Sequence, residues 1–182
     1  FRRVLFRSRY HQLNKGADRD LSELMYSGRD RRFYTAIVYD KCSWIGETVE
    51  LNLGGNLSAG VRDKEDGGWY NTTTGYYWRK GNIENPTPRA YHNCQVALHF
   101  NIVRLGEAYM NLAEAYLLKH DVPNAVKALN MTRTIHGGLS ESTAATEEEA
   151  WTDYIRERNC ELTNEGGDIY YSYLRWRSEE HT

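Results

Sequence analysis

Cysteine is scarce in this sequence, and its placement suits neither a metal site nor a disulfide framework. The three cysteines, Cys42, Cys94 and Cys160, show no CxxC or Cys–His spacing, so we interpret them as small buried residues. The histidines form no HxxxH or HExxH pattern. The sequence therefore predicts no metal site, and we expect no cofactor.

Several other motifs and patterns are absent as well. The paired glycines match neither GxGxxG nor GxxxxGK[ST], which removes support for a phosphate cradle, and no GxSxG nucleophile elbow occurs. No apolar run approaches the roughly 20 residues that span a bilayer. The formal net charge is −2, with both signs interspersed, which is not the electrostatic footprint of a nucleic-acid-binding protein.

Phenylalanine is also rare, but other aromatic residues are abundant. The chain has 14 Tyr and 5 Trp against only 4 Phe. Tyr and Trp combine an apolar ring with a polar group, so they suit a surface that is wet at one end and apolar at the other. This preference is typical of binding faces, although many of these rings are expected in the core.

The two ends of the chain look unlike the rest. Residues 3–8 read RVLFRS and residues 177–182 read RSEEHT. The codons AGATCGGAAGAGCACACG encode the second string, and their reverse complement encodes the first. This string resembles a sequencing adapter, so we expect residues 1–8 and 177–182 to be adapter-derived.

The first half of the remaining chain predicts a loop-rich region over residues 9–100. The run Tyr34–Tyr39 is rich in β-branched and aromatic residues and predicts a short strand that ends at Asp40. Residues 43–88 are dense in Gly, Thr, Asn and Asp and carry many aromatics. A loop of that length inside a domain is functional or disordered, and the aromatic content favours function.

Residues 101–176 predict helices. In the first helix, spacings of three and four place one set of apolar residues on a single face, namely Ile102, Leu105, Tyr109, Leu112 and Tyr116. Ala108, Ala113 and Ala115 are expected to let a neighbouring helix approach. Asp121 and Pro123 predict the start of a second helix, whose buried stripe is Ala125, Val126 and Leu129 and which ends at Gly137-Gly138. Such a pair resembles one tetratricopeptide unit.

A third helix is predicted to begin near Thr146, because three glutamates follow it and suit the positive end of the helix dipole. Its apolar side is Trp151, Tyr154, Ile155 and Leu162. Glu157 and Glu161 admit two interpretations, an acid–base pair as in glycosidases or structural ion pairs. The i,i+4 spacing arises easily by accident, so we favour ion pairs.

Three stretches carry a family resemblance. RLGEAYMNLAEAYL, ALNMTRTIHGG and ERNCELTNEGGDIYYSYLRW, within residues 101–176, closely resemble the C-terminal region of the SusD/RagB family. The resemblance implies a mostly α-helical, SusD-like fold with long irregular loops, here as an incomplete domain. It also implies a fold signature made by Glu157, Arg158, Glu161, Glu165, Asp168, Arg175 and Trp176.

The same resemblance implies a function. Family members are outer-membrane, surface-exposed lipoproteins of Bacteroidota that bind glycans or peptides, deliver them to a SusC-like TonB-dependent transporter, and are not enzymes. Aromatic platforms with polar neighbours can engage both the C–H face and the hydroxyls of a sugar. The expected ligand-binding residues are Trp44, Trp69, Tyr70, Asn71, Tyr76, Trp78 and Arg79.

Two other functions compete with nutrient binding. A tetratricopeptide-like protein-interaction module would need no small-molecule ligand, and a glycoside hydrolase would need two carboxylates across an open cleft. Exposed Trp44, Trp69 and Trp78 converging in one concavity would favour ligand capture, whereas their burial in the core would favour the interaction module.

Overall fold

The computed structural model describes residues 25–44, 46–51, 55, 74–82 and 102–176. It divides into two compact units, each of which is described by itself. Unit 1 contains residues 1–29 and 37–85, and unit 2 contains residues 30–36 and 86–182. Residues 1–8 and 177–182, for which we predict an adapter origin, lie outside the described residues.

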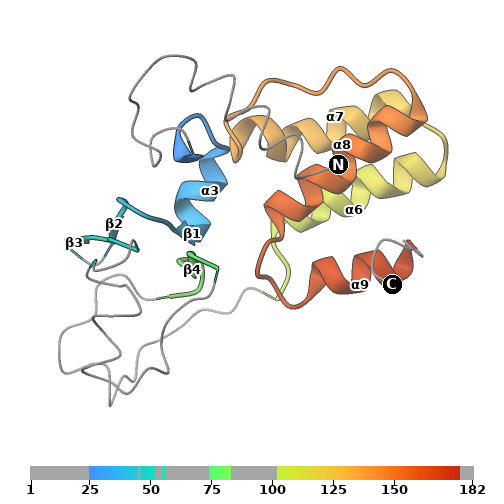
Figure 1. The fold of residues 1–182 in the computed structure, drawn as a ribbon. Helices are drawn as coiled ribbons and strands as arrows, with labels where there is room; N and C mark the ends of the chain where they lie inside the picture. The colour runs from blue at the N-terminus through green and yellow to red at the C-terminus, as the bar shows by residue number, and fades with distance from the viewer. Residues whose placement is uncertain (1–24, 45, 52–54, 56–73, 83–101, 177–182) are drawn as a thin grey trace. The chain divides into compact units, whose positions relative to one another are not determined.

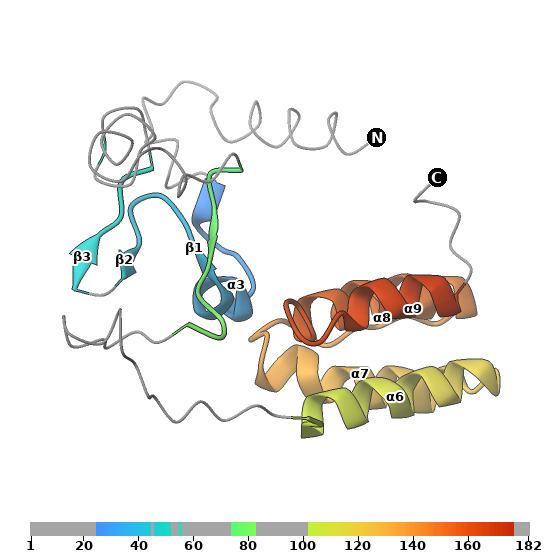
Figure 2. The ribbon, with the colours of Figure 1, turned by 90° about the horizontal axis from the view of Figure 1, so that it is seen from below.

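Unit 2 is built on an antiparallel helix pair. Helix α6 spans Leu105–Leu118 and helix α7 spans Val122–Ile135, and the two views of the ribbon show them side by side (Figures 1 and 2). The Asp121 carboxylate caps α7 by accepting a hydrogen bond from the backbone N–H of Asn124 at 3.3 Å, and Pro123 lies in the first turn. The predicted helix pair is confirmed.

Two further helices complete the C-terminal part of unit 2. Helix α8 spans Glu147–Glu161 and begins with a capping box, in which Thr146 and Glu149 exchange side-chain and backbone hydrogen bonds. Helix α9 spans Asp168–Arg175 and follows a left-handed turn at Gly167 (φ 77°). The predicted start of the third helix at Thr146 is confirmed.

The core of unit 2 lies between α6, α7 and α8. Its largest fully buried side chains are Met110, Leu117, Leu129 and Tyr154, from all three helices. The predicted apolar face of the first helix is wrong at three of its five positions, whereas Tyr116 does pack against the core. Its buried side consists instead of Gly106, Met110, Ala113, Glu114 and Leu117, while Ile102, Leu105 and Leu112 are exposed. Because α6 is apolar around most of its circumference, spacing alone fits several faces, and Glu114 is buried because it is paired.

Helix α3, Arg31–Ala36, belongs to unit 2 and corrects the predicted strand over residues 34–39. The Asp30 carboxylate accepts a hydrogen bond from the backbone N–H of Arg32 at 2.8 Å, and the Asp30 carbonyl accepts one from that of Phe33 at 2.9 Å. These bonds satisfy donors of the first helical turn and override the β propensity of the run. Only Ile37–Val38, strand β1, is extended in a sheet.

Unit 1 contains two small antiparallel pairs. Strand β1 pairs with β4, Tyr77–Trp78, in the register Ile37 to Trp78 and Val38 to Tyr77. Strand β2, Ser43–Trp44, pairs with β3, Glu47–Thr48. The buried residues Val38, Cys42 and Val49 form its core, against which Tyr39, Trp44, Leu51 and Tyr77 pack.

Candidate functional site

Trp44 lies at the end of β2 and is half-buried rather than exposed. Its ring packs on the Val38, Cys42 and Val49 core of unit 1. The indole Nε1 is buried and has no hydrogen-bond acceptor among the described residues. Trp44 therefore contributes to the core of unit 1 more than to a surface.

Trp78 is the exposed one among the described aromatics of the candidate set, with 46% of its surface accessible. It alternates along β4 with Tyr77, which packs against the core, so the two side chains point to opposite faces. The next turn is closed by two hydrogen bonds from Asn82, whose backbone N–H donates to the Arg79 carbonyl at 3.1 Å and whose side-chain amide donates to the Trp78 carbonyl at 2.5 Å. Trp78 is therefore exposed at a strand end that the two Asn82 hydrogen bonds hold in place.

Tyr76 precedes β4 and contacts Tyr26, which the sequence did not identify as a site residue. The ring of Tyr26 lies 6.2 Å from that of Tyr76, edge to face, and 4.7 Å from that of Tyr39. Burial, with the hydroxyl of Tyr76 as the next cause, raises the pKa of Tyr26 above its ordinary value. No sequence pattern marks Tyr26, because its contacts come from residues 13 and 50 positions away.

The other expected ligand residues are distributed differently. Arg79 is half-buried beside Trp78, whereas Trp69, Tyr70 and Asn71 lie outside the described residues. Tyr76, Trp78 and Arg79 lie within four consecutive residues, so their proximity follows from the sequence. The ligand-binding role of all seven residues stays a prediction.

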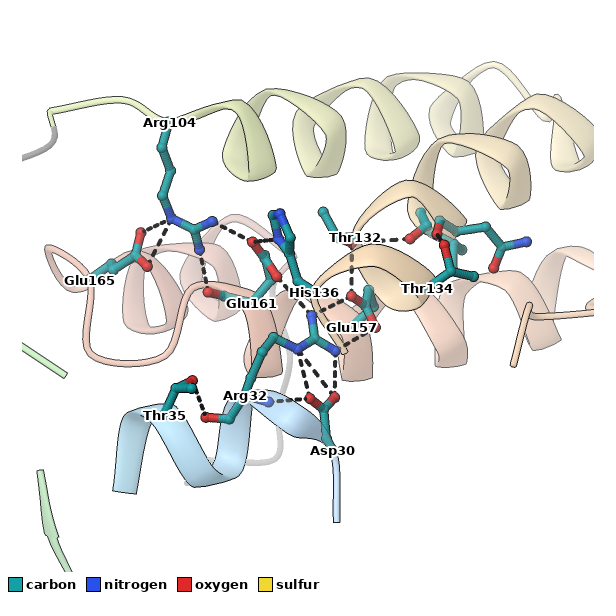
Figure 3. Close-up of polar contacts among 12 residues, drawn as sticks. Asp30, Arg32, Thr35, Arg104, Thr132, Thr134, His136, Glu157, Glu161 and Glu165 are labelled. Atoms are coloured by element: carbon teal, nitrogen blue, oxygen red, sulfur yellow. Dashed lines mark hydrogen bonds and ion pairs between the residues drawn. The ribbon is translucent and has the colours of Figure 1, made fainter. Parts of the chain in front are cut away.

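Unit 2 carries a different kind of site, a cluster of buried charges (Figure 3). Glu161, on the last turn of α8, accepts hydrogen bonds from Arg32 at 2.8 Å and from Arg104, and its Oε1 lies 2.8 Å from Nδ1 of His136. Burial would raise the pKa of Glu161, but the hydrogen bonds from Arg104, Arg32 and His136 hold it below its usual value. Glu161 is therefore an ionised anchor.

Glu157, one turn earlier, completes the cluster. It accepts hydrogen bonds from Arg32 at 2.5 Å and from the hydroxyl of Thr132 at 2.8 Å (Figure 3). Both glutamate side chains are about 1% exposed. A general acid needs a raised pKa. The lowered pKa of Glu161 therefore argues against Glu161 as the acid of an acid–base pair with Glu157.

Arg32 and Arg104 connect this cluster to distant parts of the sequence. Arg32, on α3, also holds Asp30 at 2.5 Å, and hydrogen bonds to Asp30 and Glu157 raise its pKa although burial opposes this. Arg104 precedes α6 and holds Glu165 at 2.8 Å. Their glutamate partners lie 125 and 57 residues away, so no local spacing could identify either arginine.

Two glycines leave room for these arginines. A Cβ at Gly137 would lie 2.6 Å from the Arg133 carbonyl and 2.8 Å from a guanidinium nitrogen of Arg32. A Cβ at Gly106 would collide with Arg104 and Glu161. Gly137 also accepts a hydrogen bond at 3.0 Å from the backbone N–H of Arg31, the first residue of α3. The predicted helix stop at Gly137 is therefore also a docking point for α3.

A second polar cluster joins α9 to α6 and α8. Arg158 binds Asp168 at 2.6 Å, and Glu114 binds Arg175 at 2.7 Å. Glu114 also accepts hydrogen bonds from the Tyr154 hydroxyl at 2.7 Å and from the indole N–H of Trp176 at 2.8 Å. Burial would raise the pKa of Glu114, but hydrogen bonds from Arg175 and Tyr154 lower it.

Two further findings concern the described residues alone. No group of three His, Cys, Asp or Glu side chains there is arranged to hold a metal ion. No described helix is both long and apolar enough to cross a membrane.

Comparison with known proteins decides the family. The sequence model of the SusD family matches residues 8–182. The chain belongs to the SusD family. A crystal structure of a SusD-like protein from Bacteroides fragilis NCTC 9343 is similar, with a TM-score of 0.68 and 29% identity. The match covers 84% of this chain and 29% of that one, so the sequence spans under a third of its relative's length. No curated protein matches the sequence.

The mostly helical SusD-like fold is thereby confirmed. The expected SusD signature falls on α8, the turn after it, α9 and the residue that follows α9. Each of its members takes part in one of the two polar clusters: Glu157, Arg158, Glu161, Glu165, Asp168, Arg175 and Trp176. Their structural role stays a prediction, which substitution of Glu161 tests below.

Proposed function

We propose that this SusD-family chain is part of a surface-exposed outer-membrane lipoprotein that binds oligosaccharide or peptide nutrients and delivers them to a SusC-like TonB-dependent transporter. The observation that carries this proposal is the family match over residues 8–182. The proposed role is binding without catalysis, because the buried carboxylates Glu157 and Glu161 are occupied by arginines.

Within the described residues, we propose Tyr76, Trp78 and Arg79 as the contribution to the ligand face. An exposed indole offers an apolar plane for a sugar ring or a peptide side chain, and the neighbouring guanidinium supplies hydrogen-bond donors. Trp69, Tyr70 and Asn71 belong to the same proposal from their sequence alone. Trp44 has a weaker claim, because its ring packs on the core of unit 1.

A tetratricopeptide-like interaction module is the second candidate. The antiparallel pair α6 and α7 supports it, since stacked pairs of this kind bind other proteins. This candidate needs no exposed Trp78, whereas nutrient binding uses it.

The test is binding of the full-length gene product to a panel of oligosaccharides and peptides, measured by calorimetry. Trp78→Ala should weaken binding at least tenfold while the protein stays folded. Tyr170→Ala is the matched control, because Tyr170 is an aromatic with 65% exposure in unit 2. Equal affinity of wild type and Trp78→Ala would remove Trp78 from the site. No binding to any panel member would leave the interaction module as the better proposal.

A further inference from the structure

Tyr76 belongs to the proposed ligand face, but its own strand constrains it little. Strand β4 is Tyr77–Trp78, so Tyr76 lies just before it and follows Gly75, whose φ of 76° marks a turn. The Thr74 hydroxyl donates a hydrogen bond to the Tyr76 carbonyl at 3.4 Å, which is long for such a bond. These contacts act on the backbone, so the position of the Tyr76 ring depends on its neighbours.

Side-chain alternation places Tyr76 on the same face of β4 as Trp78. Residues two positions apart in an extended segment share a face, and Tyr77 between them packs on the core of unit 1. The register pairs Val38 of β1 with Tyr77 of β4, so its continuation by one residue sets Tyr39 opposite Tyr76. Tyr39 and Tyr76 therefore face each other across the end of the strand pair.

The ring of Tyr26 contacts both of these tyrosines. Its centroid lies 4.7 Å from that of Tyr39 at an interplanar angle of 44°, and 6.2 Å from that of Tyr76 at an angle of 89°. Edge-to-face pairs at this separation are favourable, because the positive edge of one ring meets the negative face of the other. The Tyr26 ring therefore links the two segments where the backbone ladder ends.

Tyr26 is itself held in place. The Arg29 Nε donates a hydrogen bond to the Met25 carbonyl at 2.9 Å, which closes a turn around Tyr26. The Tyr26 side chain is half-buried, and it belongs to unit 1 together with β1 and β4. Burial is the first cause that raises the pKa of its phenol, and the charge and hydrogen bond of the Tyr76 hydroxyl come next. Ring contact and hydroxyl contact both connect Tyr26 with Tyr76.

We propose that Tyr26 is a positioning residue of the ligand face, because its ring fixes the Tyr76 side chain beside Trp78 before any ligand binds. The inference rests on the proposed function, since it assigns how that face is ordered. Immobilising one free side chain during binding weakens affinity roughly two- to tenfold. A Tyr76 ring that is already ordered avoids this loss, and Tyr26 achieves it without touching the ligand.

The first test needs no ligand. Fluorotyrosine incorporated in place of Tyr76 in the full-length gene product reports the surroundings of that ring by fluorine NMR. We expect a resonance displaced from its position in urea, because neighbouring rings shift it. Tyr26→Ala should move this resonance toward the urea position, whereas Tyr26→Phe keeps the ring and should retain most of the displacement. An unmoved resonance in Tyr26→Ala would overturn the inference.

The second test measures the affinity of the full-length gene product for the oligosaccharides and peptides of the panel. Tyr26→Ala should weaken binding roughly three- to tenfold, and Tyr26→Phe should stay within about twofold of wild type. Added to Tyr76→Ala, Tyr26→Ala should have no further effect, because it acts through that ring. If Tyr26→Ala does not fold, Tyr26→Leu replaces it in both tests.

Leu51→Ala is the matched control, because Leu51 is another half-buried side chain that packs on the unit 1 core. It should lower the midpoint of thermal unfolding and leave the affinity unchanged. An equal loss of affinity in Leu51→Ala, or an undiminished effect of Tyr26→Ala in the Tyr76→Ala background, would assign the loss to general destabilisation and overturn the inference.

The two proposals fail in different ways. Weaker binding by Trp78→Ala together with unchanged affinity of Tyr26→Ala would leave the proposed function standing and overturn the role of Tyr26. If wild type binds no panel member, the proposed function fails, and the ligand role of Tyr26 fails with it whatever the fluorine spectrum shows. A displaced resonance, a Tyr26→Ala loss that depends on Tyr76 and an unaffected Leu51→Ala are the expected results.

Discussion

Units 1 and 2 are stabilised by different means. Unit 2 has a core drawn from three helices, and it buries Glu157, Glu161 and Arg158 at about 1 to 2% exposure with partners for each. The described residues of unit 1 form a core cluster of three small or medium side chains and strands of two residues. Sheets that small are marginal by themselves, and aromatic rings pack beside this cluster. Of these rings, Trp44 also belongs to the expected ligand set, whereas the buried charges Glu157, Glu161 and Arg158 of unit 2 are paired with other side chains.

The proposed ligand residues and the buried charge clusters therefore belong to different units. Buried ion pairs hold one arrangement because removal of either partner leaves an uncompensated charge. Substitution of a half-buried ring such as Trp44, or of an exposed one such as Trp78, lowers the free energy of unfolding by less. Residues whose substitution costs little stability can vary to suit different ligands. Four measurements on the full-length gene product test this difference between the two units.

The largest effect is expected for Glu161→Ala. This change leaves Arg32, Arg104 and His136 without their shared carboxylate, and it should lower the free energy of unfolding by about 3 to 5 kcal/mol in urea titrations. The control is Glu147→Ala on the same helix, whose carboxylate pairs with His120 at the surface and should contribute less than about 1 kcal/mol. Similar values for the two variants would contradict the structural role of the buried cluster.

The next effect is acid sensitivity. The pKa of Glu161 and that of Glu114 are lower in the folded protein than the value of about 4.3 in an unfolded chain. The resulting stabilisation is complete above that value and is lost as the pH falls through the lower folded pKa. The urea midpoint should therefore drop as the pH falls below about 4.3, the unfolded value. Glu161→Gln should show a shallower drop, and an identical pH profile would count against the ionised anchor.

A smaller effect should separate Trp44 from Trp78 within unit 1. Trp44→Ala removes a half-buried ring from the Val38 and Val49 core and should cost about 2 kcal/mol, less than a fully buried tryptophan. Trp78→Ala should cost under about 1 kcal/mol, because the ring is 46% exposed. Thermal unfolding followed by near-UV circular dichroism would measure both. A larger loss for Trp78→Ala than for Trp44→Ala would contradict the placement of Trp44 in the core of unit 1 and of Trp78 at its surface.

The last of the four measurements is the stability of Gly137→Ala. The new methyl group would lie 2.6 Å from the Arg133 carbonyl and 2.8 Å from the Arg32 guanidinium, so the surroundings of Gly137 must shift. Overpacking of this kind should cost about 1 to 2 kcal/mol, which chemical denaturation can resolve. Ser140→Ala, an exposed change in the turn after α7, should stay within about 0.5 kcal/mol. A stabilised Gly137→Ala variant would show that α3 does not dock through this glycine.

Much of the helical region was predictable, because its signals are local. The cap at Asp121, the start at Thr146 and the stop at Gly137 each depend on residues within one turn. The buried positions Tyr154 and Leu162 also followed from spacing. The face of α6 did not, since leucine, alanine and tyrosine occur around most of that helix, and only its neighbours decide which side is covered.

The candidate sites were predictable to a lesser extent. Tyr34 lies in α3 instead of a strand, because the Asp30 carboxylate satisfies the first helical turn. Trp44 packs on the core cluster that contains Val49. The aromatic content of the sequence does not show this contact. The Glu157 and Glu161 ion pairs were the favoured interpretation, but their partners Arg32 and Arg104 were not identifiable.

The sequence by itself determined the family, the order of the helices and their ends, because motifs, caps and periodicity act between near neighbours along the chain. Tertiary structure alone decided which side of α6 is buried, which arginines neutralise Glu157 and Glu161, and which of Trp44 and Trp78 is displayed. These depend on contacts between residues separated by up to 129 positions. Burial and charge pairing at such separations follow from packing in three dimensions and leave no periodic trace in the sequence.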